Sequence, residues 1–146
     1  MLGVYLEISD EPLQIKKRLT SLGRRIKEIC RIGHDHIQYV LDEGQETHLE
    51  TISYDDLNGV RLGYRRSAGK GDRIFYHIRI DFDLKDRQNV SMVCQKALPY
   101  LGEMEKIMED HRIRIDDSLG ILEFCKGNTR YRRFRHWLES KEAQDT

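Results

Sequence analysis

Within the run of residues 74–84, the chain alternates strictly between polar and apolar side chains from residue 77 onward. Such alternation predicts a β-strand with two different faces, because successive side chains of a strand point to opposite sides of the sheet. One face carries Ile78, Ile80, Phe82 and Leu84, and the other carries His77, Arg79, Asp81 and Asp83. We expect the apolar face to pack on a core and the polar face to meet solvent or a partner.

Shorter apolar runs predict further strands at residues 2–8, 37–41, 47–52 and 60–64. Short connections rich in turn-forming residues separate the last three runs from one another and from the long strand. Strands joined in this way pair antiparallel, so we expect an antiparallel meander. Near the C-terminus, residues 113–115 and 120–124 predict one more hairpin, around a turn at residues 116–119.

Apolar residues at helical spacing predict two main helices. The first covers residues 13–32, begins after the capping residues 9–12 and ends at Gly33. Its apolar stripe consists of Ile15, Leu19, Leu22, Ile26 and Ile29. The second covers residues 90–108, where Pro99 and Gly102 predict a kink or a break. Its stripe consists of Val90, Val93, Ala97, Leu101, Met104 and Met108. A third, short helix follows Thr129, which is a candidate cap.

These elements predict the α+β class. We expect an antiparallel sheet of about five to seven strands, with two main helices packed on one face and a short basic C-terminal helix. The pattern contains no internal repeat and no composition shift that would mark a linker. We therefore expect residues 1–142 to form a single domain and residues 143–146 to form a frayed tail.

Composition narrows the class of protein. The chain has 146 residues, of which 38% are hydrophobic and 34% are charged, so it is globular rather than disordered. No apolar run approaches the roughly 20 residues of a membrane-spanning helix, and no signal peptide is visible at Met1. The three cysteines are far apart and never form a Cys-x-x-Cys pair. We expect a soluble cytoplasmic protein with buried thiols, no membrane partner and no cofactor.

Charge is distributed unevenly although the formal net charge is zero. Residues 13–32 carry seven basic side chains and one acid, and residues 126–138 carry five basic side chains and no acid. Residues 65–73 form a further basic loop between two predicted strands; this loop lacks the P-loop pattern. Local basic surfaces of this kind favour an anionic partner.

The C-terminal segment interleaves arginines with aromatic residues. If it is helical, Tyr131, Phe134 and Leu138 share a stripe that docks on the domain, and the arginines face elsewhere. In the functional alternative, the arginines and Trp137 bind RNA, DNA or an acidic protein, without base-specific readout. The candidate partner-binding residues are Arg24, Arg31, Arg65, Arg66, Lys70, Arg130, Arg132, Arg133, Arg135 and Trp137.

The favoured hypothesis is therefore a small binding domain for nucleic acid or an acidic protein surface, rather than an enzyme. The first alternative is a metal-assisted or acid–base enzyme on the polar sheet face. Histidine with carboxylate is a ligand set that suits zinc or iron, and the candidate ligands are His34, His36, His77 and Asp81. A second alternative is a homodimeric interaction module that uses the exposed sheet face or the kinked second helix.

Overall fold

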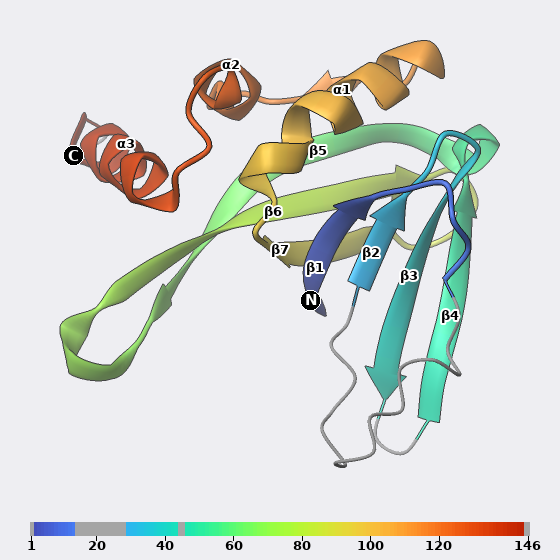
Figure 1. Cartoon of the computed structure of the whole chain (residues 1–146), viewed down its shortest axis with the longest axis horizontal. Helices are drawn as coiled ribbons and strands as arrows, with labels where there is room; N and C mark the ends of the chain where they lie inside the picture. The colour runs from blue at the N-terminus through green and yellow to red at the C-terminus, as the bar shows by residue number, and fades with distance from the viewer. Residues whose placement is uncertain (1, 14–28, 44–45, 145–146) are drawn as a thin grey trace.

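One mixed sheet organises the protein (Figure 1). The computed structural model describes residues 2–13, 29–43 and 46–144, and over these residues the sheet has eight strands in the order β4-β3-β2-β1-β7-β6-β5-β8. The strands are β1 Leu2–Ile8, β2 Ile29–Ile32, β3 His36–Glu43, β4 Glu46–Ser53, β5 Leu57–Ala68, β6 Ile74–Leu84, β7 Val90–Gln95 and β8 Ile115–Asp116. The helices are α1 Leu101–Asp110, α2 Ile121–Cys125 and α3 Tyr131–Gln144.

The α+β class is confirmed, but the expectation of a purely antiparallel sheet is wrong. Strand β1 runs parallel to both of its neighbours, β2 and β7, and β8 runs parallel to β5. The sheet is also larger than the five to seven strands expected, because β2 and β7 both fall where helices were predicted. A parallel pair needs a long connection, so short-turn reasoning does not reveal it.

The long alternating strand is confirmed, with the predicted bounds. Along β6 the side chains of Ile78, Ile80, Phe82 and Leu84 are buried, while those of the opposite face are exposed or half-buried. Strand β5 pairs with the whole of β6, from Leu57↔Leu84 to Ala68↔Ile74. Strand β7 pairs with β6 only as far as Ile78. The β5–β6 hairpin therefore continues beyond β7 as a two-stranded arm, drawn in green in Figure 1.

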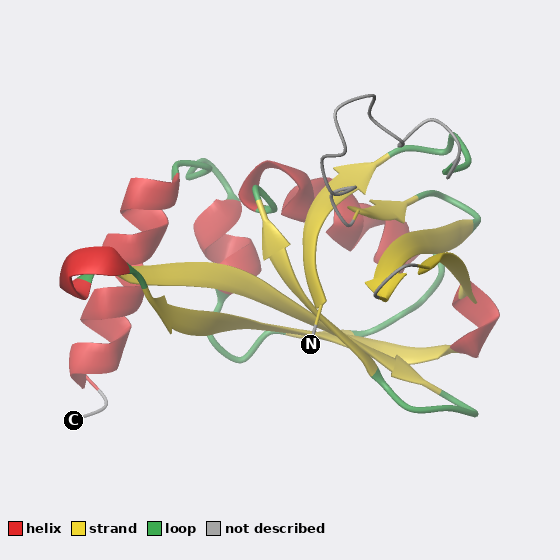
Figure 2. Ribbon diagram, turned by 90° about the horizontal axis from the view of Figure 1, so that it is seen from below, coloured by secondary structure: helices red, strands yellow, loops and turns green. Residues whose placement is uncertain are grey.

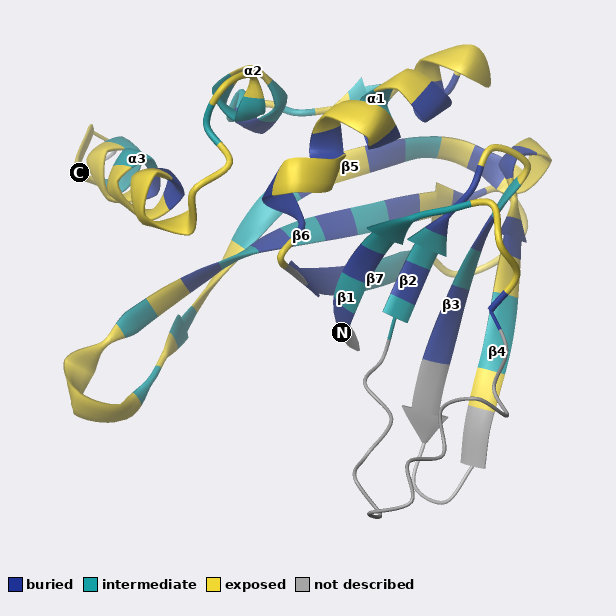
Figure 3. Ribbon diagram, viewed as in Figure 1, coloured by how far each residue is buried: buried dark blue, intermediate teal, exposed yellow. Residues whose placement is uncertain are grey.

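The helices cover one side of the sheet, and side chains from both layers form one core (Figure 2). Helix α1 contributes Leu101, Met104, Ile107 and Met108, and α3 contributes Phe134 and Leu138. Buried positions alternate with half-buried or exposed ones along β6, as Figure 3 shows, because only one face of the hairpin meets these helices.

The first predicted helix is wrong at both of its ends. Residues 9–13 are not helical, and Ile29–Ile32 form β2. Ile29 continues the helical spacing of the apolar stripe, but Cys30 and Ile32 are buried while Ile29 and Arg31 are half-buried, which is the period of a strand. Residues 14–28, with the rest of the predicted stripe, lie outside the described residues.

The second predicted helix is wrong over its first part and correct over its second. Val90–Gln95 form β7, a central strand between β1 and β6 in which Met92, Val93 and Cys94 are all buried. A strand buried on both faces shows no alternation, so its apolar residues fitted a helical spacing equally well. The expected break is present: Pro99 lies in the 3₁₀ turn Leu98–Tyr100, and α1 begins at Leu101.

The predicted hairpin at residues 113–124 is also wrong, because its second strand is helix α2. The Asp117 carboxylate accepts hydrogen bonds from the backbone N–H groups of Ile121 (2.9 Å) and Leu122 (2.8 Å), which fixes the start of this helix. The C-terminal helix is confirmed as α3. Its first hydrogen bond runs from the Phe134 N–H to the Arg130 carbonyl, so Arg130, not Thr129, precedes its first residue.

Candidate functional site

The part of the β5–β6 arm that is nearest to β7 lies against α3, and a carboxylate fixes the two together. Glu142 of α3 accepts hydrogen bonds from the hydroxyls of Tyr64 (2.9 Å) and Tyr76 (3.2 Å). The same carboxylate pairs with the Arg66 guanidinium at 3.3 Å. Tyr64 and Arg66 come from β5 and Tyr76 from β6, so one residue near the end of α3 holds both strands.

A second contact joins the start of α3 to the open edge of β6. The Tyr131 hydroxyl accepts a hydrogen bond from the Tyr76 backbone N–H at 3.0 Å. Strand β7 does not extend to this level, since its pairing with β6 ends at Ile78. The Tyr131 side chain thus accepts the hydrogen bond from a backbone N–H group that a neighbouring strand would otherwise bind.

These contacts gather basic residues from two segments far apart in the sequence. We call residues 64–77 and 128–142 together the basic end; they carry nine lysines and arginines against three acids. Two of those acids are held by neighbours: Glu142 as above, and Glu139 by Arg135 at 3.2 Å. Because the whole chain has a net charge of zero, this end is positive and the remainder is negative.

Most of the predicted partner-binding residues lie in the basic end. They are Arg65, Arg66, Lys70, Arg130, Arg132, Arg133 and Arg135, and all of them are exposed. The side chains of Arg130 and Arg132 form no ion pair with any carboxylate in the described part of the chain. Arg133 donates to the Asn128 side-chain oxygen at 3.3 Å.

The basic residues do not share a single face. Arg66 points toward α3, where it meets Glu142, whereas Arg65 lies opposite His77 on the other face of the hairpin. Burial, and to a lesser degree the Arg65 charge, lower the pKa of His77 below its ordinary value. Arg132, Arg133 and Arg135 lie on α3 away from its buried residues, Phe134 and Leu138.

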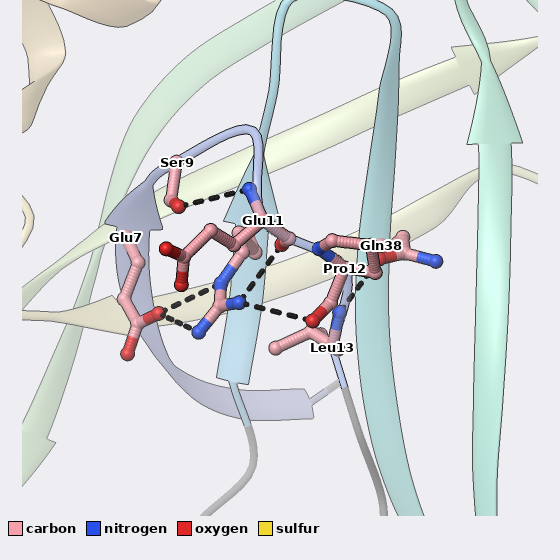
Figure 4. A network of polar contacts seen from close by, with 7 residues as sticks. Glu7, Ser9, Glu11, Pro12, Leu13 and Gln38 are labelled. Atoms are coloured by element: carbon pink, nitrogen blue, oxygen red, sulfur yellow. Dashed lines mark hydrogen bonds and ion pairs between the residues drawn. The ribbon is translucent and has the colours of Figure 1, made fainter.

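Two predicted residues are engaged inside the molecule. The Trp137 ring is half-buried and stacks on Phe124, with ring centroids 4.7 Å apart. The Arg31 guanidinium donates to Glu7 from Nε at 3.0 Å and from Nη2 at 2.9 Å, and its Nη1 donates to the Glu11 carbonyl at 2.8 Å (Figure 4). We therefore leave both out of the candidate site. Arg24 lies outside the described residues.

An apolar hollow of about 530 Å³ lies beside the basic end, and we call it the aromatic hollow. Residues of β6, the end of β7, the turn Leu98–Tyr100 and the start of α3 line it. Phe75, Tyr100 and Tyr131, the large apolar side chains that the described residues expose, all belong to its lining. Sequence reasoning missed Phe75, Lys96 and Tyr100, because nothing in their local pattern indicates that they meet.

A different hollow, of about 410 Å³, lies on the polar face of the sheet. It is lined by residues that include three arginines and three aspartates: Arg61, Arg79, Arg114, Asp81, Asp83 and Asp116. Arg79 pairs with Asp81 at 3.0 Å, and Arg61 with Asp116 at 3.5 Å. The polar face is therefore concave, but its charges are balanced and no histidine contributes to this lining.

The candidate metal ligands do not converge. His36 is in β3 and His77 is in β6, and three strands, β2, β1 and β7, lie between them in the sheet. His34 precedes β3 and bonds to Asp10 at 2.9 Å, and His77 lines the aromatic hollow rather than the hollow that holds Asp81. Over residues 2–13, 29–43 and 46–144 no group of three or more histidine, cysteine or acidic side chains is arranged to hold a metal ion.

A comparison of the chain with protein-family models, with curated proteins and with solved structures finds no match. Among the described helices, none has the length and apolar character needed to cross a membrane. What the protein binds must therefore be inferred from its own side chains.

Proposed function

We propose that the protein is a non-catalytic binding domain for nucleic acid, and that the basic end is its contact surface. Arginine guanidinium groups suit phosphate oxygens, which they contact through paired N–H donors. Contacts of this kind position a protein on the backbone without reading base sequence, so we expect weak sequence preference.

One observation carries the proposal: exposed basic side chains from the hairpin arm and from α3 are gathered at one end, and the acids of that end are mostly already engaged. Glu142 and Glu139 are held by neighbouring residues, whereas Arg130 and Arg132 form no ion pair among the described residues. A cation that has a carboxylate partner is partly neutralised. Arg130 and Arg132 lack such a partner among the described residues, so their charges are available to a phosphate backbone.

The test compares two triple variants from which the same charge is removed. The first is Arg132→Ala, Arg133→Ala and Arg135→Ala on α3. The matched control is Lys85→Ala, Arg87→Ala and Lys106→Ala, which are exposed positions outside the basic end. Affinity is measured for single-stranded RNA, single-stranded DNA and duplex DNA at one fixed salt concentration.

We expect the α3 variant to lose about tenfold or more in affinity for each nucleic acid it binds, irrespective of sequence, and the control to stay within about twofold of the wild type. Equal losses of affinity in both variants would show that binding depends on net charge alone, which would contradict the proposal. If the wild type binds no nucleic acid, an acidic protein surface takes its place as the candidate partner.

The two alternatives from the sequence stay proposals of lower rank. The metal-assisted or acid–base enzyme now lacks a convergent ligand set among the described residues, although the polar hollow with its three aspartates offers acid–base groups. The homodimeric module would use the open polar face of the sheet, and no contact among the described residues favours it over the basic end.

A further inference from the structure

Three exposed aromatic rings surround one hollow at the basic end. Phe75 is 39% exposed, Tyr100 37% and Tyr131 42%, and they come from β6, from the turn before α1 and from the start of α3. Single exposed rings scattered over a surface are ordinary. Three rings from separate elements around one apolar hollow form a contiguous apolar patch, which is typical of a binding site. Aromatic faces of this kind are stacking platforms for other planar rings.

The charge around the hollow restricts what it accepts. Its lining includes Lys96 but no aspartate or glutamate. Thr129 lines it too, and also lines a smaller hollow of about 250 Å³ that contains Arg130 and Arg133. A planar apolar surface is therefore adjacent to cationic side chains, which suits a ligand with an aromatic ring and a negative charge.

An extended peptide added as a strand is the other occupant that an open strand edge suggests. Strand addition needs free backbone N–H and C=O groups along β6. The Tyr76 N–H is already bonded to the Tyr131 hydroxyl, so the edge is capped at the level of the hollow. The capped edge favours a ligand that stacks on the rings over one that pairs with the backbone.

From these observations we propose that the aromatic hollow binds an unstacked base of a single-stranded nucleic acid whose phosphates contact Arg130 and Arg133. This inference rests on the proposed function and narrows it from nucleic acid in general to a single strand. In a duplex the bases are stacked and paired, and their faces are not accessible to Tyr100 or Tyr131. Phosphate contacts alone would not distinguish a single strand from a duplex.

The experiment uses the wild-type chain of 146 residues and four probes. They are a short oligothymidylate, an abasic strand with the same number of phosphates, a duplex of the same length, and thymidine monophosphate. We expect the oligothymidylate to bind about tenfold more tightly than the abasic strand, because stacking of a base on an aromatic ring contributes that much. Tyr100→Ala should remove this difference, whereas Tyr100→Phe, which keeps the ring, should retain it. The abasic comparison needs no variant and is independent of any effect on folding.

Four outcomes are distinguishable. Tighter binding of the base-bearing strand, lost in Tyr100→Ala and kept in Tyr100→Phe, supports the inference. Equal, salt-dependent affinity for the oligothymidylate, the abasic strand and the duplex would overturn it and leave the proposed function standing. Thymidine monophosphate that binds as tightly as the strand would overturn the strand as the occupant. Absence of binding to every probe would overturn both the inference and the proposed function.

Discussion

Arg31 shows how a single side chain can be mistaken for a partner-binding residue. Its guanidinium bonds to the Glu7 carboxylate and the Glu11 carbonyl, so it joins β1, β2 and the segment after β1. We expect Arg31→Ala to lower the free energy of unfolding by about 1–3 kcal/mol, since hydrogen bonds to a charged group are lost in a partly buried place.

The measurement for Arg31 is chemical denaturation, with Arg31→Lys as the control. Lysine keeps the charge but not the planar fork, so it should restore less than half of the lost stability. Nucleic-acid affinity should stay at the wild-type value in both variants. A stable Arg31→Ala variant with weakened binding would instead place Arg31 in the contact surface.

His34 and Asp10 form an exposed pair whose protonation is coupled. The hydrogen bond to Asp10 raises the pKa of His34, and hydrogen bonds from the His34 backbone and ring lower the pKa of Asp10. The stability that His34 contributes is present below its ordinary pKa of about 6.5 and is lost as pH rises through its folded value. The contribution of Asp10 is present above about pH 3.9 and is lost as pH falls through its folded value.

We therefore expect an NMR titration to show His34 with a pKa above that of a free histidine. In Asp10→Asn the same resonance should titrate at or near the ordinary value. An unchanged His34 pKa in Asp10→Asn would show that the pair does not form in solution.

At the scale of single residues, the sequence predicted correctly which side chains of β6 are buried, but it did not predict which side chains contact one another. The alternation in β6 separated buried Ile80 from half-buried Asp81 because period-2 spacing is local information. That Trp137 stacks on Phe124, or that Tyr100 and Phe75 line one hollow, depends on how distant segments pack. Local spacing carries no signal for such contacts.

Helix α3 and the arm formed by β5 and β6 support each other at their interface. The Tyr131 hydroxyl caps the Tyr76 N–H, so Tyr131→Phe leaves a backbone donor at the edge of β6 without that acceptor. We expect this variant to lose about 1 kcal/mol of stability, the usual net value of one hydrogen bond. The amide proton of Tyr76 should exchange faster than in the wild type, which NMR hydrogen exchange measures directly. Unchanged exchange at Tyr76 would show that the cap is not formed.

At the scale of elements, the errors of sequence reasoning share a physical cause. Strands β2 and β7 lie at or near the centre of the sheet. In β7 the apolar residues follow one another, and in β2 Ile29 continues the apolar spacing that predicted a helix. Their assignment is decided by parallel pairing with β1, which is non-local. The break near Pro99 was predicted correctly because proline acts on its own backbone.

For the whole molecule, the sequence indicated basic segments but not that they meet. Residues 65–73 and 130–135 are some sixty positions apart, and the contacts of Glu142 with Tyr64, Tyr76 and Arg66 bring them to the same end. The sheet order likewise separates His36 from His77, which the sequence placed together in one candidate site. The topology of the sheet and the packing of α3 decide which of these residues meet. The local pattern of each segment carries no information on either.

The most direct test of the account is the salt dependence of binding to a single strand. Each phosphate that a basic side chain neutralises contributes about −0.7 to the slope of log affinity against log salt concentration. With Arg132, Arg133 and Arg135 all replaced by alanine, the slope should become shallower by about 2, while the Lys85, Arg87 and Lys106 control keeps the wild-type slope. An identical slope in the wild type and the α3 variant would contradict the claim that the basic end binds a nucleic-acid backbone.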